Sequence, residues 1–225
     1  RAVEKDTADY KEIVYEGYAP HVEAEFAQLG IPCFIDRTRG IVLNPMIEYI
    51  KSALALFLKD FSYESVFHYL RSGMADMARE DVDRLENYVI ETGIRGYYKW
   101  NRLFTHKTAR MGEDEEPLKK LNGSRERLIE QLKALDFRKN AAEKSAHGGK
   151  LPAKAYVDAL YDFLTANQVQ QKLLQYENFF TEQGDLSKAR EYAQIYRLVM
   201  ELLEQVYRLL GEEEITLQEF ADILE

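Results

Sequence analysis

The fold is decided by residues 185–211, DLSKAREYAQIYRLVMELLEQVYRLLG, which keep helical periodicity longer than any other run in the chain. Apolar side chains recur at alternating steps of three and four, so they line up along one side of an α-helix. They are Leu186, Ala189, Ala193, Tyr196, Met200, Leu203, Tyr207 and Leu210. A second stripe runs beside the first, through Tyr192, Ile195, Val199, Leu202, Val206 and Leu209. Since well over a third of the circumference is then apolar, we expect other elements to cover this helix on two sides.

Both ends of this helix carry capping signals. Asp185 can accept hydrogen bonds from the first backbone N–H groups as N-cap, and Gly211 can take the left-handed conformation that ends a helix. At roughly 1.5 Å per residue the helix is about 39 Å long, which is enough to span a domain. A two-stranded coiled coil is the competing interpretation, but its apolar seam should be narrower, so packing within the chain is favoured.

Shorter helices predicted elsewhere make the expected fold mainly α. Asn44-Pro45 combines an N-cap with Pro at the first helical position, Ser62 can cap another helix, and Thr216-x-x-Glu219 is a capping box. Further helices are expected over residues 9–28, 81–92 (with Gly93 as stop), 124–140, from Pro152 onward, and 169–180. Residues 31–35 are the one convincing strand, which needs a partner from a neighbouring piece of chain unless it is an extended crossing. Residues 141–150 are the best linker candidate.

Composition restricts the class of protein. The 225 residues suffice for one large domain, or for one domain plus a fragment of another. The single cysteine, Cys33, excludes an intrachain disulfide and a multi-cysteine metal site. Because no apolar run approaches a membrane span and the charged N-terminus has no signal-peptide core, we expect a soluble, cytoplasmic protein. The chain opens at Arg1 without Met and stops inside a helical pattern, so we expect a piece of a longer protein.

Charge is segregated along the chain, and this points to one candidate site. The net charge is −9, yet residues 95–140 hold twelve Lys/Arg against seven Asp/Glu. After the turn Gly93-Ile94-Arg95-Gly96, aromatic rings alternate with cations. Rings can stack on bases and cations can hold phosphates, so this stretch predicts contact with nucleic acid. The candidate residues are Arg95, Lys99, Trp100, Arg102, Lys107 and Arg110. The alternative is a partly buried amphipathic helix with a solvated basic face.

Other motifs favour ordinary structural roles. His147-Gly148-Gly149-Lys150 lacks the first glycine and the Ser/Thr of a phosphate-binding loop, and it does not follow a strand. The four histidines have no second ligand at helical spacing, so no metal site is expected. Acidic runs such as residues 212–214 are solvated faces without the apolar setting that acid–base catalysis needs. No catalytic residue is predicted.

Several stretches together resemble one family, the B component of the AddAB (RexAB) ATP-dependent helicase-exonuclease. They are GIPCFID at 30–36 with Arg39 and Asn44-Pro45, YESVFHYLRSG at 63–73, LENY at 85–88, GIRG at 93–96, and residues 185–196 and 214–225. The resemblance covers essentially the whole chain. The chain departs from the family at Cys33, where an aromatic is more usual, and at Asn44-Pro45-Met46, where the family more often has His-Pro-Leu.

This resemblance implies a place in a larger machine. Residues 1–45 would be a remnant of a helicase-like 2A segment, and residues 46–225 a helical domain resembling the 2B region of superfamily 1 helicases. The family implies ATP, Mg²⁺ and an iron–sulphur cluster in the parent, an AddA/RexA-type helicase-nuclease subunit as partner, and double-stranded DNA as substrate in break repair and recombination. None of the catalytic, nuclease or cluster motifs can be placed on this sequence.

Three hypotheses follow. The first is a noncatalytic region that braces the helicase-like core and guides duplex DNA, with the six candidate residues at the contact. The second is a docking scaffold for protein partners without DNA contact. The third, an independent enzyme, requires turnover by this chain alone, and we expect neither ATPase nor nuclease activity from it.

Overall fold

The computed structural model describes residues 25, 26, 28–30, 44–109, 111–112, 114–137 and 149–224. The chain divides into two units, residues 1–41 and 42–225, and the architecture below is that of the second. This unit is mainly α-helical, as the sequence predicts, and its described part contains one pair of two-residue strands. The expected strand at 31–35, most of the expected helix at 9–28 and most of the linker at 141–150 lie outside the described residues.

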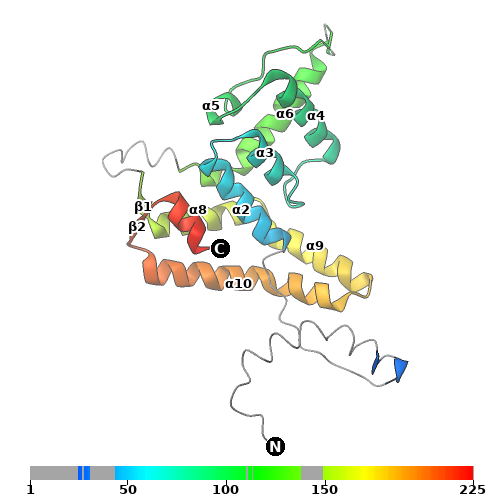
Figure 1. Cartoon of the computed structure of the whole chain (residues 1–225), viewed down its shortest axis with the longest axis vertical. Helices are drawn as coiled ribbons and strands as arrows, with labels where there is room; N and C mark the ends of the chain where they lie inside the picture. Colours follow the sequence, from blue (N-terminus) through cyan, green and yellow to red (C-terminus); the bar gives the residue numbers. More distant parts are fainter. Residues whose placement is uncertain are drawn as a thin grey trace, which may run out of the picture. The chain divides into compact units, whose positions relative to one another are not determined.

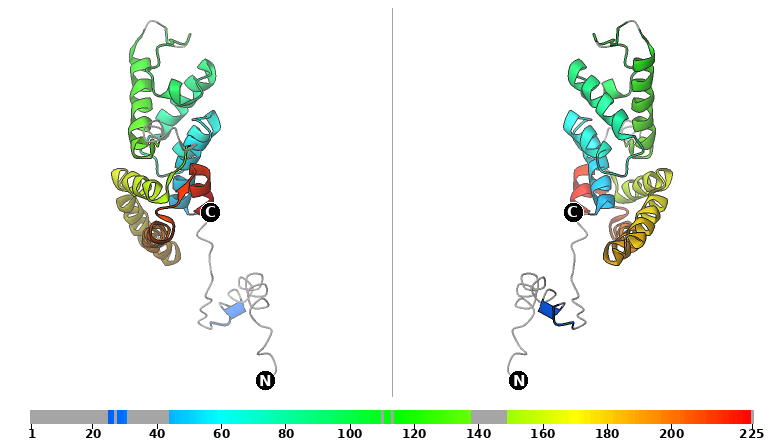
Figure 2. Two further views of the ribbon diagram at one scale, coloured as in Figure 1. Left: turned by 90° about the vertical axis from the view of Figure 1, so that its left-hand side faces the viewer. Right: turned by 90° about the vertical axis from the view of Figure 1, so that its right-hand side faces the viewer.

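The described helices and strands follow one another along the chain in this order (Figure 1). They are α2 (Pro45–Leu58), α3 (Tyr63–Leu70), α4 (Arg79–Thr92), α5 (Tyr97–Trp100), α6 (Glu116–Gln131), the 3₁₀ helix η2 (Lys133–Leu135), β1 (Leu151–Pro152), α8 (Ala153–Ala166), α9 (Val169–Glu182), α10 (Leu186–Leu210), β2 (Glu214–Ile215) and α11 (Leu217–Ile223). Figures 1 and 2 show α4, α5 and α6 at one end of the unit and α8, α9 and α10 at the other.

Helix α10 begins where the sequence predicts, because the Asp185 carboxylate accepts a 3.0 Å hydrogen bond from the backbone N–H of Lys188. Its buried side chains form a single stripe, which packs against α9 and α8. They are Ala189, Tyr192, Ile195, Val199, Leu203 and Val206. Both flanks of this stripe carry exposed apolar residues, among them Leu209 at 72% accessibility. The expectation that α10 is covered on two sides is therefore wrong for the described part of the chain.

The end of α10 also differs from the prediction. Gly211 keeps right-handed helical angles, φ −53° and ψ −34°, instead of the left-handed conformation. A Cβ atom at this position would lie 2.2 Å from the carbonyl oxygen of Tyr207, which is far inside van der Waals contact. Glycine is therefore needed here for space, because the chain turns too tightly against the last turn of α10 for any side chain.

The same turn supplies the N-terminal cap of α8. The carbonyl oxygens of Gly211 and Glu213 accept hydrogen bonds from the backbone N–H groups of Lys154 and Ala153, at 3.1 and 2.9 Å. β1 and β2 pair antiparallel beside them, with Leu151 opposite Ile215. The first N–H groups of a helix need acceptors outside the helix. The chain after α10 supplies these acceptors to α8, and so connects the C-terminal end of α10 to the N-terminal end of α8.

Four of the predicted local signals act as expected. Asn44 caps α2 through the backbone N–H of Met46, Ser62 caps α3, Gly93 ends α4 in the left-handed conformation, and Thr216 forms a capping box with Glu219. The helix expected at 124–140 is wrong in its bounds, since α6 runs from Glu116 to Gln131. Pro117 lies in the first turn of α6, where its missing N–H is not needed.

Stacked aromatic side chains connect the two ends of the unit through its core. The Tyr49 ring stacks on Tyr69 and on Phe163 of α8, at centroid distances of 5.2 and 5.1 Å. The two tyrosine hydroxyls lie 3.0 Å apart, and Tyr69 donates to Oε1 of Gln131 at 3.1 Å. Buried hydroxyls are thus paired, and α2, α3, α6 and α8 are tied to one another.

Candidate nucleic-acid interface

The turn between α4 and α5 places the basic stretch on the surface. Gly96 has φ +83°, and a Cβ there would lie 3.1 Å from Oδ2 of Asp60. The other oxygen of this carboxylate accepts a 3.3 Å hydrogen bond from the backbone N–H of Tyr97, the first residue of α5. Only glycine combines a positive φ with so close a neighbour. These two interactions with Asp60, which follows α2, therefore fix the position of α5.

Helix α5 is a single turn, and residues 101–109 continue as a loop that two helices hold in place. The Asn122 side chain of α6 accepts from the backbone N–H of Phe104 at 2.8 Å and donates to its carbonyl at 3.0 Å. Arg125 of α6 donates to the carbonyl of Trp100 at 3.1 Å. From α4, the hydroxyl of Tyr88 donates to the carbonyl of His106 at 3.0 Å. The amphipathic-helix alternative thus fails beyond Trp100, because α5 ends there and these bonds hold an irregular loop.

Exposed cations and rings project from this fixed backbone. The Arg102 guanidinium lies 3.8 Å from the centroid of the Tyr98 ring, a cation–π stack. Tyr98 is 64% accessible and Leu103 is 68% accessible, so both side chains are open to a partner. The Lys99 ammonium lies 3.5 Å from the carbonyl of Gly93, at the C-terminus of α4, where a positive charge is favoured.

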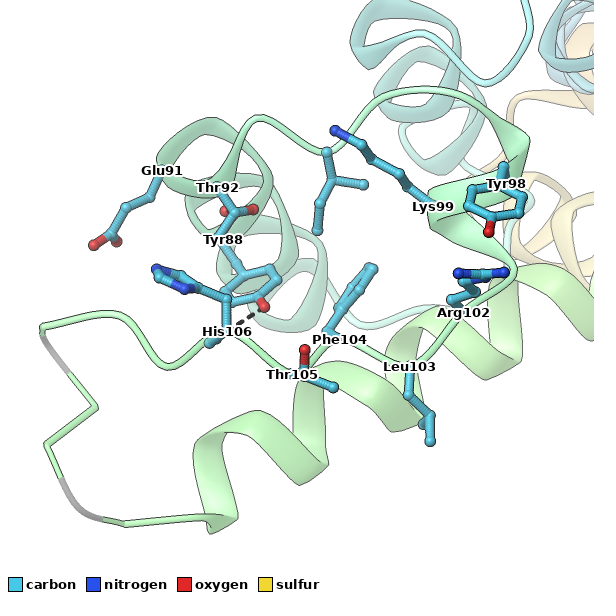
Figure 3. Close-up of a pocket in the computed structure, with 11 residues that line it drawn as sticks. Tyr88, Glu91, Thr92, Tyr98, Lys99, Arg102, Leu103, Phe104, Thr105 and His106 are labelled. Atoms are coloured by element: carbon cyan, nitrogen blue, oxygen red, sulfur yellow. Dashed lines mark hydrogen bonds between the residues drawn. The ribbon is translucent and has the colours of Figure 1, made fainter.

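A pocket of about 460 Å³ opens between the last turns of α4, α5 and the loop (Figure 3). Its lining combines aromatic rings, cations and small polar groups. The lining residues are Tyr88, Glu91, Thr92, Ile94, Tyr98, Lys99, Arg102, Leu103, Phe104, Thr105 and His106. Burial raises the pKa of Tyr88, so its hydroxyl stays protonated and keeps donating to His106. The pocket wall is therefore held by a neutral, stable hydrogen bond.

The six sequence-predicted contact residues do not all come together. Lys99 and Arg102 line the pocket, and Arg95 is exposed on the turn that precedes it. Lys107 is exposed but forms an ion pair with Glu115 at 3.5 Å. Arg110 lies outside the described residues.

Trp100 requires a correction. Its side chain is completely buried and meets Phe104 edge to face at a centroid distance of 5.8 Å. An indole in this position supports the loop from beneath and is not available to stack on a base. The exposed ring of the stretch is Tyr98, two residues earlier, because residues two apart in a helix point to nearly opposite sides.

Sequence reasoning missed the α4 side of the pocket. Tyr88, Glu91 and Thr92 precede the basic stretch by several residues, and nothing in the sequence shows that the loop folds back onto them. The available signal was the helical spacing that brings Tyr88 and Thr92 to one face. Within the ranges that the structure describes, no group of three or more His, Cys, Asp or Glu side chains is placed to hold a metal ion.

Comparison with known proteins gives a consistent result. A protein from Clostridium botulinum (strain Hall) is 37% identical over 216 residues, which is 93% of this chain and 18% of the relative. Relatives from Lachnoclostridium phytofermentans and Acetivibrio thermocellus are 34% and 36% identical over 100% and 93% of the chain, and it covers 20% and 18% of them. All three are named as the B component of an ATP-dependent helicase/deoxyribonuclease. No family model matches the chain. The chain thus spans about a fifth of the length of these relatives.

Proposed function

Since this chain is homologous to one segment of AddB/RexB, the B component of the ATP-dependent helicase/deoxyribonuclease, we propose that it is a noncatalytic, helical region of such a protein. In this proposal it braces the helicase-like core and guides duplex DNA during repair of double-strand breaks. Residues 1–45 belong to a 2A-like segment and residues 46–225 to a 2B-like domain. The partner is an AddA/RexA-type helicase-nuclease, and the complex works in the cytoplasm.

One observation carries the DNA contact: Lys99 and the stacked pair Arg102–Tyr98 are exposed on α5 and at the start of the loop that follows it, whose backbone is fixed. A fixed backbone keeps the entropy lost on binding small, because the cations are already held near one another. Arg95 adds a third exposed cation on the adjoining turn. Cations in such a group hold phosphates regardless of base sequence, as a guiding surface requires.

Cofactors of the parent belong elsewhere in this proposal. The relatives' names state ATP dependence, and the resemblance adds Mg²⁺ and an iron–sulphur cluster. The described residues offer no metal-holding group, and Cys33 is the one cysteine of the whole sequence, whereas such clusters are held by several cysteines. We therefore place ATP hydrolysis, cleavage and the cluster in parts of the parent that this chain does not contain.

The proposal predicts salt-dependent binding of a short duplex by the chain. If Arg95, Lys99 and Arg102 each neutralise one phosphate, the logarithm of the binding constant should fall with the logarithm of salt concentration at a slope of about −2.7. Fluorescence anisotropy at a series of salt concentrations measures this slope. Absence of duplex binding at low salt would contradict the DNA contact.

A second candidate function, protein docking without DNA contact, is favoured by apolar side chains left exposed on the helices at the other end of the unit. On α8, α9 and α10 they are Tyr161, Leu174, Phe179, Leu186, Leu202, Tyr207 and Leu209. Side chains of this kind are common at protein interfaces. Co-purification with the AddA/RexA-type partner together with no DNA binding at low salt would favour this function over the first.

Within the described residues, none of the helices has the length and apolar character needed to cross a membrane.

A further inference from the structure

One side of α10 and the adjoining edge of α8 form an apolar patch at the end of the unit opposite the basic loop (Figure 1). Tyr196, Met200 and Tyr207 follow one another along α10 at steps of four and seven residues, so they lie on one side of this helix. Tyr161 of α8 completes the set, which we call the α8–α10 patch. Tyr161 and Tyr207 are 52% and 46% accessible, whereas Tyr196 and Met200 are partly buried against the core.

Interactions between the two helices show that these side chains belong to one surface. Burial raises the pKa of Tyr196, and the nearby Tyr161 raises it further. A 2.6 Å hydrogen bond to Glu212 raises the pKa of Lys154 on α8, and Tyr207 makes a smaller contribution in the same direction. Tyr161 therefore lies near Tyr196, and Tyr207 lies near the first turn of α8.

Negative charge borders the α8–α10 patch on both helices. Asp158 lies three residues before Tyr161 on α8, and Glu204 lies three residues before Tyr207 on α10. Side chains three apart are neighbours on a helix surface, so each carboxylate lies beside a ring of the patch. Both carboxylates are exposed. A partner that covers the rings therefore meets these charges as well.

The cations near the patch do not neutralise its border. Lys154 is paired with Glu212, and Arg197 is paired with Glu201 at 2.7 Å. Residues 149–225 hold seven Lys/Arg against fourteen Asp/Glu, a net charge of −7. Such a field repels phosphates, so this surface is unsuited to the DNA that we assign to the basic loop.

We propose that the α8–α10 patch binds an amphipathic helix of a protein partner, one whose apolar face is bordered by Lys and Arg. The proposal rests on the docking function described above and not on the DNA contact. From Tyr196 to Tyr207 the patch extends about 16 Å, the length of three helical turns. Over this distance a partner helix presents apolar anchors at i, i+4 and i+7. Its cations meet Asp158 and Glu204, and this charge complementarity selects the partner.

Two labelled peptides of equal length test this partner chemistry. Both carry the same leucines on one helical face, and the polar positions are lysine in one peptide and glutamate in the other. Anisotropy titration with the whole 225-residue chain at physiological salt gives the affinities. We expect the lysine peptide to bind about tenfold more tightly than the glutamate peptide, because only its charges complement the carboxylates at the border.

Replacing Tyr161 and Tyr207 together by serine should weaken binding of the lysine peptide about tenfold, because the exposed rings supply most of the contact. Leu174 and Phe179 provide the matched control, since both are similarly exposed apolar residues on α9. Replacing these two by serine should change the affinity by no more than about twofold. Circular dichroism checks that each variant is folded.

Charge reversal is a second test that leaves every apolar contact in place. Asp158→Lys combined with Glu204→Lys should weaken the lysine peptide about tenfold and strengthen the glutamate peptide. Glu91→Lys combined with Glu126→Lys is the control, because these exposed residues of α4 and α6 change the net charge equally. We expect the control to weaken the lysine peptide by no more than about threefold.

The outcomes separate this proposal from the others. Equal affinity for the two peptides overturns it, and so does a preference for lysine that survives either double variant of the patch. Equal weakening by the two charge reversals also overturns it, because net charge alone then explains the attraction. If the chain co-purifies with the AddA/RexA-type partner but fails these tests, docking stands and the α8–α10 patch is the wrong surface. Loss of duplex binding by the wild-type chain overturns only the DNA contact.

Discussion

A chain in which Lys99 and Arg102 are both replaced by glutamate is expected to bind a short duplex about 100-fold more weakly than the wild-type chain at low salt. Each replacement removes one phosphate contact and adds a repulsive charge, and a loss of about 1.4 kcal/mol at each site corresponds to tenfold in affinity. Both side chains are exposed, so the fold should be unaffected. Anisotropy titration with a labelled duplex gives the affinity, and circular dichroism checks the fold.

The matched control makes the same change of charge elsewhere. Arg190 and Arg197 are exposed on α10, at the other end of the unit, and replacing both by glutamate alters the net charge equally. We expect a reduction of no more than about threefold, caused by the more negative overall field. If the two double variants weaken binding to the same extent, attraction depends on net charge alone and the loop has no special role.

Replacing Gly211 by alanine is expected to lower the free energy of unfolding by about 3 kcal/mol. The new methyl group would lie 2.2 Å from the Tyr207 carbonyl, and because that neighbour is backbone, the turn itself has to shift. The shift would also disturb the hydrogen bond from Lys154 to Gly211 that helps to cap α8. Denaturant unfolding followed by circular dichroism measures the change.

Gly123 provides the control for this substitution. It lies inside α6, and a Cβ atom there would meet nothing within 4 Å. Alanine is a better helix former than glycine, so Gly123→Ala should stabilise the chain by about 0.5–1 kcal/mol. Opposite signs for the two Gly→Ala variants would support the tight turn after α10. Stabilisation by Gly211→Ala would contradict it.

Local signals along the chain could be predicted well, because each depends on a few adjacent residues. Asp185 and Ser62 cap their helices, and Gly93 takes the left-handed conformation, as their residue types dictate. The environment of α10 could not be predicted in the same way. Helical spacing shows that Leu209 lies on an apolar flank, but only the tertiary arrangement shows that α9 and α8 cover the stripe beside it.

For the candidate site, too, local features could be predicted from the sequence and tertiary contacts could not. Of the residues in the alternating pattern after Gly96, Lys99 and Arg102 are exposed and line the pocket, and their contact with DNA stays a prediction. The same pattern was wrong for Trp100, because its ring points to the side of α5 opposite Tyr98 and packs against Phe104. Helical spacing places Tyr88 and Thr92 on one face of α4, but it does not show that the loop folds back onto this face. The contribution of Tyr88 depends on its hydrogen bond to a carbonyl in that loop.

Photo-crosslinking from position 98 tests the central claim, DNA contact at the loop held between α4 and α6, most directly. Tyr98 is replaced by p-benzoylphenylalanine, and the chain is irradiated with labelled duplex DNA. A second chain carries the same group at Leu174, which is similarly exposed on α9. The account predicts a covalent protein–DNA adduct from position 98 and almost none from position 174. Adduct formation from position 174 equal to or greater than that from position 98 would contradict it.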